Sequence, residues 1–206
     1  MSDQASGGSE DVRRGLRKSS DPRAGRTRER LFAAAQSLCA RDDEVSVSAL
    51  VREAGVSRSA FYTHFADVGE LALRMIEPVF EEIAATAAAA RAEDPHRAMR
   101  EAQEGLAAHV HADRSLYRAA FLLPGGTLLE RMRDAMVVPL AAHIETVQPP
   151  EGIRADITAG YIAGAATGVL ADWVTGRIDA SPSTLADHLY LLMPAWMHEP
   201  TNQPSE

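Results

Sequence analysis

The spacing of apolar residues predicts helices, most clearly between residues 46 and 65. One apolar stripe recurs there at intervals of three and four residues, made of Val47, Leu50, Val51 and Ala54. Gly55 follows and lacks the Cβ that would oppose the left-handed backbone at a helix end. Ser46 and Ser57 stand before the two helical stretches and are favoured N-cap residues. The pattern predicts two short helices joined by a tight turn.

The second of these helices carries side chains suited to DNA. Phe61 and Phe65 lie four residues apart and are expected to anchor the helix inward. An outward arc of roughly 140°, at about 100° per residue, is left to four residues: Arg58, Ser59, Tyr62 and Thr63. A helix-turn-helix places its second helix in the major groove. The alternative is that any helical protein can contain two short helices with a glycine between them.

The flanking segments predict further helices. Thr27 is placed to cap a first helix that runs to about Ala40. Asp67 and Glu70 have the spacing of a capping box for a long helix that runs to about Ala92. Asp94-Pro95 then opens another helix, because proline is tolerated in the first turn.

Breaks at residues 123–127 and at Pro149-Pro150 divide the remainder. Helical periodicity lies between them, in Leu128, Met132, Ala135, Met136 and Leu140. A helix is predicted from Ile153 to about Gly176, and a last one from Ser181-Pro182 to near Trp196. We expect an all-α fold of nine helices without strands. Three helices form a DNA-binding domain over residues 26–70, and six form a second domain over residues 71–206.

Composition narrows the class of protein. The chain has 206 residues, of which 46% are hydrophobic, and no apolar run reaches the roughly 18 residues of a membrane span. Its N-terminal arginines are not followed by the apolar segment of a secretory signal. The single cysteine, Cys39, excludes an internal disulfide, and its place on the apolar side of the first helix suits structural filler. We therefore expect a cytoplasmic protein with no membrane partner.

The net charge of −8 is unevenly distributed. Residues 1–65 carry eleven basic and nine acidic residues, whereas residues 66–206 carry ten and twenty. Only the surface that faces phosphate must be positive, so this asymmetry is compatible with DNA binding. Residues 1–25 contain almost no large apolar side chains and are expected to be disordered. Two interpretations of this arm stay open: a solvated tail, or a basic arm that follows the DNA backbone or enters the minor groove.

Several of these segments resemble the tetracycline-repressor (TetR) family of bacterial regulators. Residues 28–40 look like the family's first helix, and Ala54-Gly-Val-Ser57 looks like its turn. Phe61-Tyr-Thr-His-Phe65 resembles the end of its recognition helix, and Asp67-Val-Gly-Glu-Leu71 the start of its fourth helix. The resemblance covers about residues 26–75. It implies a homodimer that binds a double-stranded DNA operator and responds to a small-molecule effector.

The expected DNA contacts of individual residues are assigned from their positions in the helix-turn-helix. Arg58 is the expected base reader, since a guanidinium pairs bidentately with guanine, although it could instead be a surface arginine near phosphate. Ser59 and Thr63 are expected at base edges or thymine methyl groups. Tyr62 and His64 resemble the family's phosphate-contacting pair, with capping or packing against the first helix as the alternative for His64. Phosphate contacts are also expected from the helix starts: Ser46, Ser48, Thr27 and Arg28.

One position departs from the family pattern. The family usually has a lysine that contacts the DNA backbone where Val68 stands. Valine cannot make that contact. Either one phosphate contact is missing or the arginine-rich arm replaces it.

The resemblance implies an effector pocket among the middle helices. Its candidate residues are Phe80, His109, Tyr117, Phe121, Met132, Met136 and Trp173. For each of them, however, plain core at helical spacing is the more common explanation. His109, His111 and Asp113 suggest a metal, but histidines two apart on a helix point about 200° apart, so we expect none. We expect no cofactor beyond an unknown effector, and we expect no enzyme.

A dimer interface is expected near the C-terminus. Gly160, Gly164 and Gly168 lie four apart, and each costs about 1 kcal/mol inside a helix relative to alanine. Close approach of another helix, from a partner or from the same subunit, would justify them. In the TetR family the last two helices of each subunit form a four-helix interface. A stripe of Leu185, Leu189 and Leu192, with Met193 and Trp196, would suit that role.

The sequence thus favours a repressor that binds a palindromic operator as a homodimer and is released by a small molecule. Half-sites would lie roughly 34–36 Å apart or at multiples of that distance. An activator or corepressor-dependent regulator of the same fold is one rival. The other, from a different class, is a helical protein that binds or carries small molecules and has no DNA function.

Overall fold

The computed structural model describes residues 22–89, 94–147 and 149–197, and helices account for most of them. Within these ranges there are nine α-helices and no strands, which confirms the all-α prediction. The helices are α2 (Pro22–Ala40), α3 (Val47–Ala54), α4 (Arg58–His64), α5 (Val68–Ala89), α6 (Pro95–Ala112), α7 (Arg114–Phe121), α8 (Leu128–Thr146), α9 (Ala155–Val174) and α10 (Pro182–Leu191). A single 3₁₀ turn, η2 (Ala195–Met197), follows α10.

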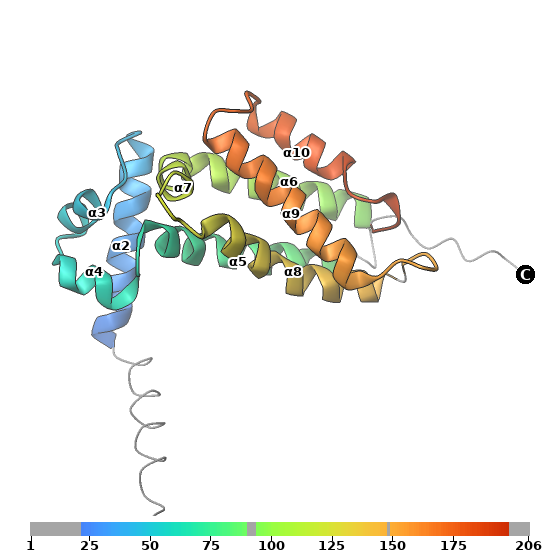
Figure 1. Ribbon diagram of the computed structural model, residues 1–206, viewed down its shortest axis with the longest axis horizontal. Helices are drawn as coiled ribbons and strands as arrows, with labels where there is room; N and C mark the ends of the chain where they lie inside the picture. Colours follow the sequence, from blue (N-terminus) through green and yellow to red (C-terminus); the bar gives the residue numbers. More distant parts are fainter. Residues whose placement is uncertain (1–21, 90–93, 148, 198–206) are drawn as a thin grey trace, which may run out of the picture.

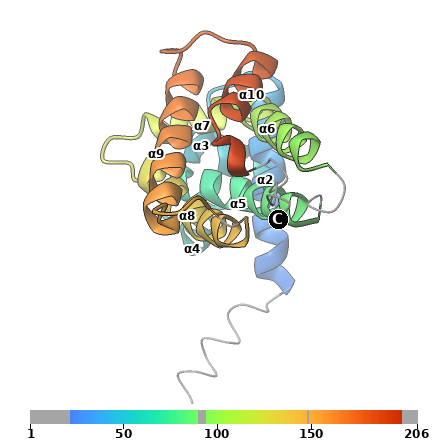
Figure 2. The same ribbon diagram turned by 90° about the vertical axis from the view of Figure 1, so that its right-hand side faces the viewer.

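Two groups of helices share the molecule (Figure 1). The helices α2, α3 and α4 gather at one end, and the other six extend from them as an elongated body. Viewed along that body, α8 and α9 form one side and α6 and α10 the other (Figure 2). One apolar core runs through both groups, from Leu31 in α2 through Leu71 in α5 to Leu189 in α10.

Local sequence explains four of the nine described helix starts. The side chains of Ser46, Ser57, Asp94 and Ser181 each accept a hydrogen bond from a backbone N–H three residues later. Gly55 ends α3 in the left-handed region, at φ 61°. These caps were all predicted, because each depends only on neighbours along the chain.

Some predicted boundaries were wrong. Thr27 does not cap the first helix, since α2 already includes Pro22, four residues before the predicted start of the domain at 26. The last helix ends at Leu191 rather than near Trp196, and Pro194 separates it from η2. Asp113 divides the stretch between Pro95 and Phe121 into α6 and α7, a break that was not predicted. The rest of the predicted arm, residues 1–21, lies outside the described residues.

The longest apolar helix, α9, needs separate comment. Its 20 residues and its mean hydropathy of 1.2 are sufficient for a membrane span, but 44% of that window is buried inside the subunit. Its buried side packs against α8, with Ala159, Ala163 and Leu170 in the core. It is therefore a partly buried core helix.

Candidate DNA-binding surface and ligand pocket

Aromatic side chains hold the buried face of the helix α4. Phe61 is fully buried, and its ring centroid lies 5.6 Å from that of Phe65. Phe65 in turn lies 5.7 Å from Phe32 of α2. Aromatic pairs at such distances add to the free energy of burial. These contacts hold one face of α4 against α2 and leave the opposite face in solvent.

The four residues of the predicted outward arc are all exposed: Arg58, Ser59, Tyr62 and Thr63. Tyr62 leaves 57% of its surface exposed, a large value for an aromatic residue. The hydroxyl of Thr63 donates to the carbonyl oxygen of Ser59 at 2.9 Å, so its methyl group is the part left for an outside contact. His64 is half-buried beside Phe65.

A hydrogen bond joins α4 to α3. Nη2 of Arg58 donates to Oγ of Ser48 at 2.6 Å, so two residues expected to contact DNA contact each other. Ser46 accepts from the amide of Ala49 at 3.2 Å and has a structural role as the α3 cap. Arg30 of α2 reaches the same turn, where its Nη2 donates to the carbonyl oxygen of Gly55 at 3.2 Å.

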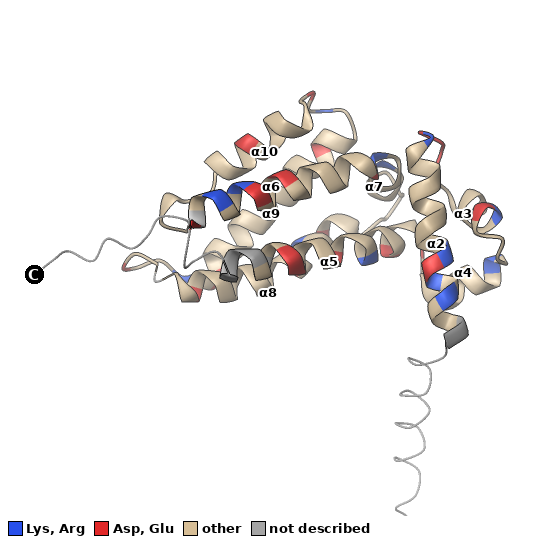
Figure 3. Ribbon diagram, turned by 180° about the vertical axis from the view of Figure 1, so that it is seen from behind, with Lys and Arg blue, Asp and Glu red and all other residues tan. Residues whose placement is uncertain are grey.

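A second group of predicted residues meets where α2 crosses the end of α4. A hollow of about 570 Å³ lies there, with Arg28, Thr63 and His64 in its lining. Arg74 of α5 also lines it and was not singled out from the sequence. Thr27 lies next to Arg28 on α2 and is half-buried. In Figure 3 the ribbon of α2, α3 and α4 at this end of the molecule carries positions of Lys and Arg, coloured blue. Val68, in contrast, is 4% exposed and belongs to the core.

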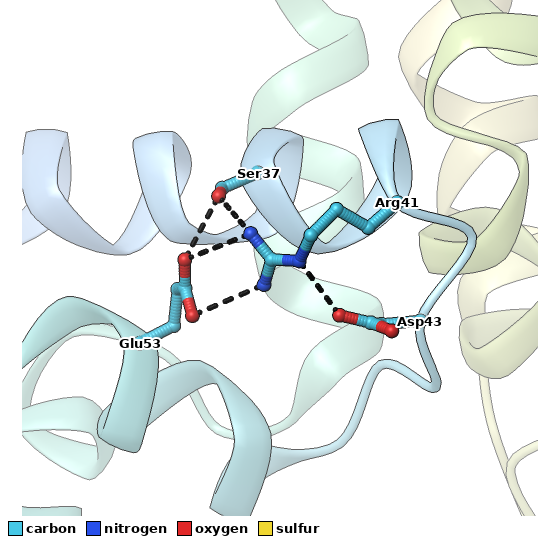
Figure 4. A network of polar contacts seen from close by, with 4 residues as sticks. All are labelled: Ser37, Arg41, Asp43 and Glu53. Atoms are coloured by element: carbon cyan, nitrogen blue, oxygen red, sulfur yellow. Dashed lines mark hydrogen bonds and ion pairs between the residues drawn. The ribbon is translucent and has the colours of Figure 1, made fainter.

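An ion-pair network holds α3 against α2 (Figure 4). Nη1 and Nη2 of Arg41 lie 3.2 and 3.1 Å from the two carboxylate oxygens of Glu53, and Ser37 donates to Glu53 at 2.8 Å. Nε of Arg41 pairs with Asp43 at 2.8 Å. The hydrogen bond from Arg41 is the main reason that the pKa of Glu53 lies below its ordinary value. Bidentate geometry of this kind adds directional contacts between α3 and the residues at the end of α2.

An apolar cavity of about 190 Å³, partly open to solvent, lies in the described part of the body. Five helices contribute to its wall, α5, α6, α8, α9 and α10. Of the seven residues predicted for an effector pocket, only Phe80 and Met136 line it. The sequence analysis missed its polar residues, Gln103, His143 and Tyr161. Gln103 follows Met99 by four residues and precedes Leu106 by three, and a polar residue within an apolar helical stripe was the available signal.

The other five candidates do not line this cavity. Tyr117 and Trp173 are fully buried in the core, and Met132 is 1% exposed there. Nε1 of Trp173 donates to the carbonyl oxygen of Ala180 at 2.8 Å, a structural hydrogen bond. Phe121 is partly buried against the same core. The fifth, His109, belongs to a polar cluster beneath α2.

This cluster lies where α6 and α7 meet α2. Nε2 of His109 and the hydroxyl of Tyr117 are 2.8 Å apart, and Asp113 lies 3.9 Å from Nδ1. Burial lowers the pKa of His109 and raises that of Asp113. Burial also raises the pKa of Cys39 to about 11, so its thiol stays protonated and unreactive. Among the described residues no group of His, Cys, Asp and Glu side chains is arranged to hold a metal ion.

The glycines of α9 face open space. A Cβ added at Gly160, Gly164 or Gly168 would meet nothing within 4 Å, so no helix of the same subunit packs closely there. Ile157 and Tyr161 lie on the same side and are 62% and 76% exposed. Leu185 and Leu189, which were predicted for the dimer interface, are both buried, and their helix α10 packs against α6 of the same subunit. Leu192, at 76% exposure, stays accessible.

The fold has known relatives among solved structures. Residues of this chain superpose on a fatty acid degradation regulator from Bacillus halodurans with a TM-score of 0.52, at 15% identity over 81% of this chain and 93% of that one. A repressor implicated in biodegradation of n-alkanes, from Dietzia sp., gives 0.52 at 20% identity, over 82% and 96%. A transcriptional repressor from R. erythropolis gives 0.50 at 15% identity, over 81% and 94%. No curated protein matches the chain in sequence.

The DNA-binding end also matches a family model. Residues 31–75 fit the model described as bacterial regulatory proteins of the tetR family. This segment runs from α2 into α5 and includes both helices of the predicted helix-turn-helix. The match sets aside a small-molecule carrier without DNA function and places the chain among regulators rather than enzymes. Residues 31–75 of the chain thus carry the DNA-binding domain of the TetR family of bacterial transcriptional regulators.

Proposed function

We propose that the protein is a cytoplasmic repressor that binds a palindromic operator as a homodimer and is released by a small-molecule effector. The main support is the exposed arc of α4, which carries Arg58 and Tyr62 above a face fixed by Phe61 and Phe65. Arg58 would read a guanine, and Ser59 and Thr63 would meet neighbouring bases. Tyr62, His64, Ser46, Ser48, Thr27 and Arg28 would contact phosphates and fix the register of the protein on DNA.

A homodimer is supported by the exposed side of α9. The open glycine positions, with Ile157 and Tyr161 beside them, form an apolar strip that a helix of a second subunit could approach closely. Leu191 and Leu192 at the end of α10 add two large exposed side chains. Gly160, Gly164 and Gly168 are therefore kept as proposed interface residues together with Leu192.

Release by an effector requires a connection between the cavity and α4, and α5 offers one. Its first half supplies Leu71 to the core that supports α4, and its second half supplies Phe80 and Ile83 to the cavity wall. Pro78 lies between these halves, where it removes one hydrogen bond from the helix. A ligand in the cavity that displaces the second half of α5 would also shift its first half, which supports α4.

The junction between α4 and α5 is held by one carboxylate. Glu70 accepts from the amide of Ala66 at 2.7 Å, directly after α4, and its own amide donates to Asp67 at 2.8 Å. Arg131 of α8 lies 3.8 Å from the other oxygen of Glu70. Because α8 also lines the cavity, it gives a second route from the cavity to α4. In the proposed dimer the two α4 helices must be correctly spaced to bind DNA. An effector weakens DNA binding only to the extent that it binds more tightly to a conformation in which this spacing is wrong.

Solved structures with this fold include both a repressor and an activator. The n-alkane relative is described as a repressor, and another, at 16% identity and a TM-score of 0.51, as an operon activator. We favour repression, in which the bound dimer occludes a promoter. A reporter gene behind a bound fragment decides between them, because deleting the regulator raises expression for a repressor and lowers it for an activator.

The DNA-binding part is tested by selection of genomic fragments with the purified full-length protein. We expect enriched fragments to share an inverted repeat, and Arg58→Ala to lose preference at one base pair of each half-site. An Arg52→Ala variant is the control, since Arg52 is an exposed arginine of α3. Enrichment without a repeat, or a protein that sediments as a monomer on its fragment, would contradict the proposal.

A further inference from the structure

We infer that the cavity selects a small uncharged molecule, mostly apolar, with one hydrogen-bonding group that meets Gln103. This deepens the function proposed above and rests on it, because it names the chemical class of the effector. The inference depends on three features of the cavity: its lack of charge, one buried amide and its size.

Charge is missing from the wall of the cavity. Seventeen described residues line it, and none of them is Asp, Glu, Lys or Arg. A carboxylate, phosphate or ammonium group placed there would lose part of its hydration without gaining an Arg, Lys, Asp or Glu partner, which is unfavourable. Ligands with a charged group inside the cavity are therefore selected against.

The amide of Gln103 is the polar feature that needs an explanation. The residue is 8% exposed, and within the described structure its side chain makes one hydrogen-bonding contact, from Nε2 to Sδ of Met99 at 3.6 Å. Thioether sulfur is a weak acceptor. A buried amide with so weak a partner is costly for the folded protein unless something else completes its hydrogen bonds. A hydroxyl or carbonyl group of a ligand in the cavity would do so.

The volume of the cavity and the side chains of its wall limit the size and shape of the apolar part of the ligand. An engineered protein cavity of about 150 Å³ accepts benzene, and this cavity is slightly larger at about 190 Å³. Met99, Met136 and Met193 contribute flexible, polarisable side chains from different parts of the chain. A single ring or a short branched chain with one polar substituent fits these limits.

Four probes that share one ring test the charge rule in the wild-type full-length protein: toluene, benzyl alcohol, benzoate and benzylammonium. Dissociation constants would be measured at neutral pH, without DNA, by ligand-observed NMR titration. We expect benzyl alcohol to bind most tightly, and benzoate and benzylammonium to bind at least tenfold more weakly. Equal affinity for either ion, or no binding of the two neutral probes, overturns the inference.

Gln103→Leu tests the amide, and Glu104→Leu is the control because Glu104 is the exposed neighbour on the same helix. We expect Gln103→Leu to abolish the preference for benzyl alcohol over toluene while toluene still binds, which also shows that the variant is folded. The control should keep the wild-type preference. An unchanged preference in Gln103→Leu overturns the role of the amide.

A mobility-shift titration with the same probes separates this inference from the proposed function. A protein that binds benzyl alcohol as expected, yet keeps its DNA at saturating probe, contradicts release by an effector and supports the chemistry of the cavity. A protein released by benzoate and not by benzyl alcohol supports release and overturns the chemistry of the cavity.

Discussion

Arg58 of α4 donates a hydrogen bond to the hydroxyl of Ser48 in α3, with 2.6 Å between Nη2 and Oγ. Both side chains are exposed, so this contact is made on the surface that would face DNA. A long side chain held in one orientation loses less conformational entropy when it binds. Ser48 therefore acts on Arg58 before DNA arrives.

This relationship predicts the outcome of a double-mutant cycle. We expect Arg58→Ala to cost about 1–3 kcal/mol in operator affinity and Ser48→Ala to cost about 1 kcal/mol. In the double variant, loss of Ser48 should cost at least about 0.5 kcal/mol less than it does alone, because the partner is gone. Fluorescence anisotropy on a selected operator would measure all four affinities. Strictly additive losses would show that the two residues act independently.

Tyr62 tests whether a side chain of α4 contacts phosphate and so positions the protein on DNA without reading a base. Its hydroxyl is proposed to contact phosphate, so Tyr62→Phe should weaken operator and non-operator DNA by the same factor, two- to tenfold for about 1 kcal/mol. Affinities for both duplexes at two salt concentrations would show it. A loss confined to the operator would instead make Tyr62 a base-reading residue.

Gly164 provides a matched test of the proposed dimer surface. Gly164 and Gly105 both lie within helices, and a Cβ at either would meet nothing within 4 Å in the subunit. Leucine at either position should therefore leave the isolated fold intact. We expect Gly164→Leu to shift the protein toward monomer and Gly105→Leu to leave the dimer unchanged. Sedimentation velocity over a concentration series would decide, and a dimer that survives Gly164→Leu argues for another interface.

The buried His109 predicts a dependence of stability on pH. Because burial lowers its pKa in the folded state, the unfolded state binds more protons as the pH falls through about 6.5, the usual pKa of histidine. The free energy of unfolding should thus decrease between pH 7.5 and 5.5. Asp113, whose pKa is raised by burial, acts in the opposite direction as the pH falls through that raised pKa.

Urea unfolding at both pH values would measure this effect. His109→Gln should reduce the decrease, whereas the control His188→Gln, an exposed residue of α10, should retain it. An identical decrease in wild type and His109→Gln would assign the dependence to other groups.

The features that the sequence predicted are those decided by near neighbours. Ser46, Ser57 and Gly55 act on backbone groups within a few residues, and their roles follow from residue type and spacing alone. The exposed arc of α4 follows from the inward positions of Phe61 and Phe65. In each case the regular geometry of a helix converts spacing along the sequence into position in space.

The sequence was less informative where distant segments compete for the same surface. Leu185 and Leu189 form a genuine apolar stripe, but periodicity does not tell which helix covers it, and α6 of the same subunit does. Tyr117 and Trp173 resembled pocket residues for the same reason and proved to be core. The cavity depends on the space left between five helices, which no local pattern encodes.

The continuous core beneath α2 and α4 has a consequence for engineering. Leu71 and Ala72 are fully buried in that core although they lie beyond residue 70, and Ser115 at the start of α7 bonds to Asp42 after α2 at 2.9 Å. A chimera that exchanged only residues 26–70 for those of another regulator would leave these side chains facing a foreign surface. Retargeting this protein to a new promoter therefore requires the graft to carry the first half of α5 and a matched α7.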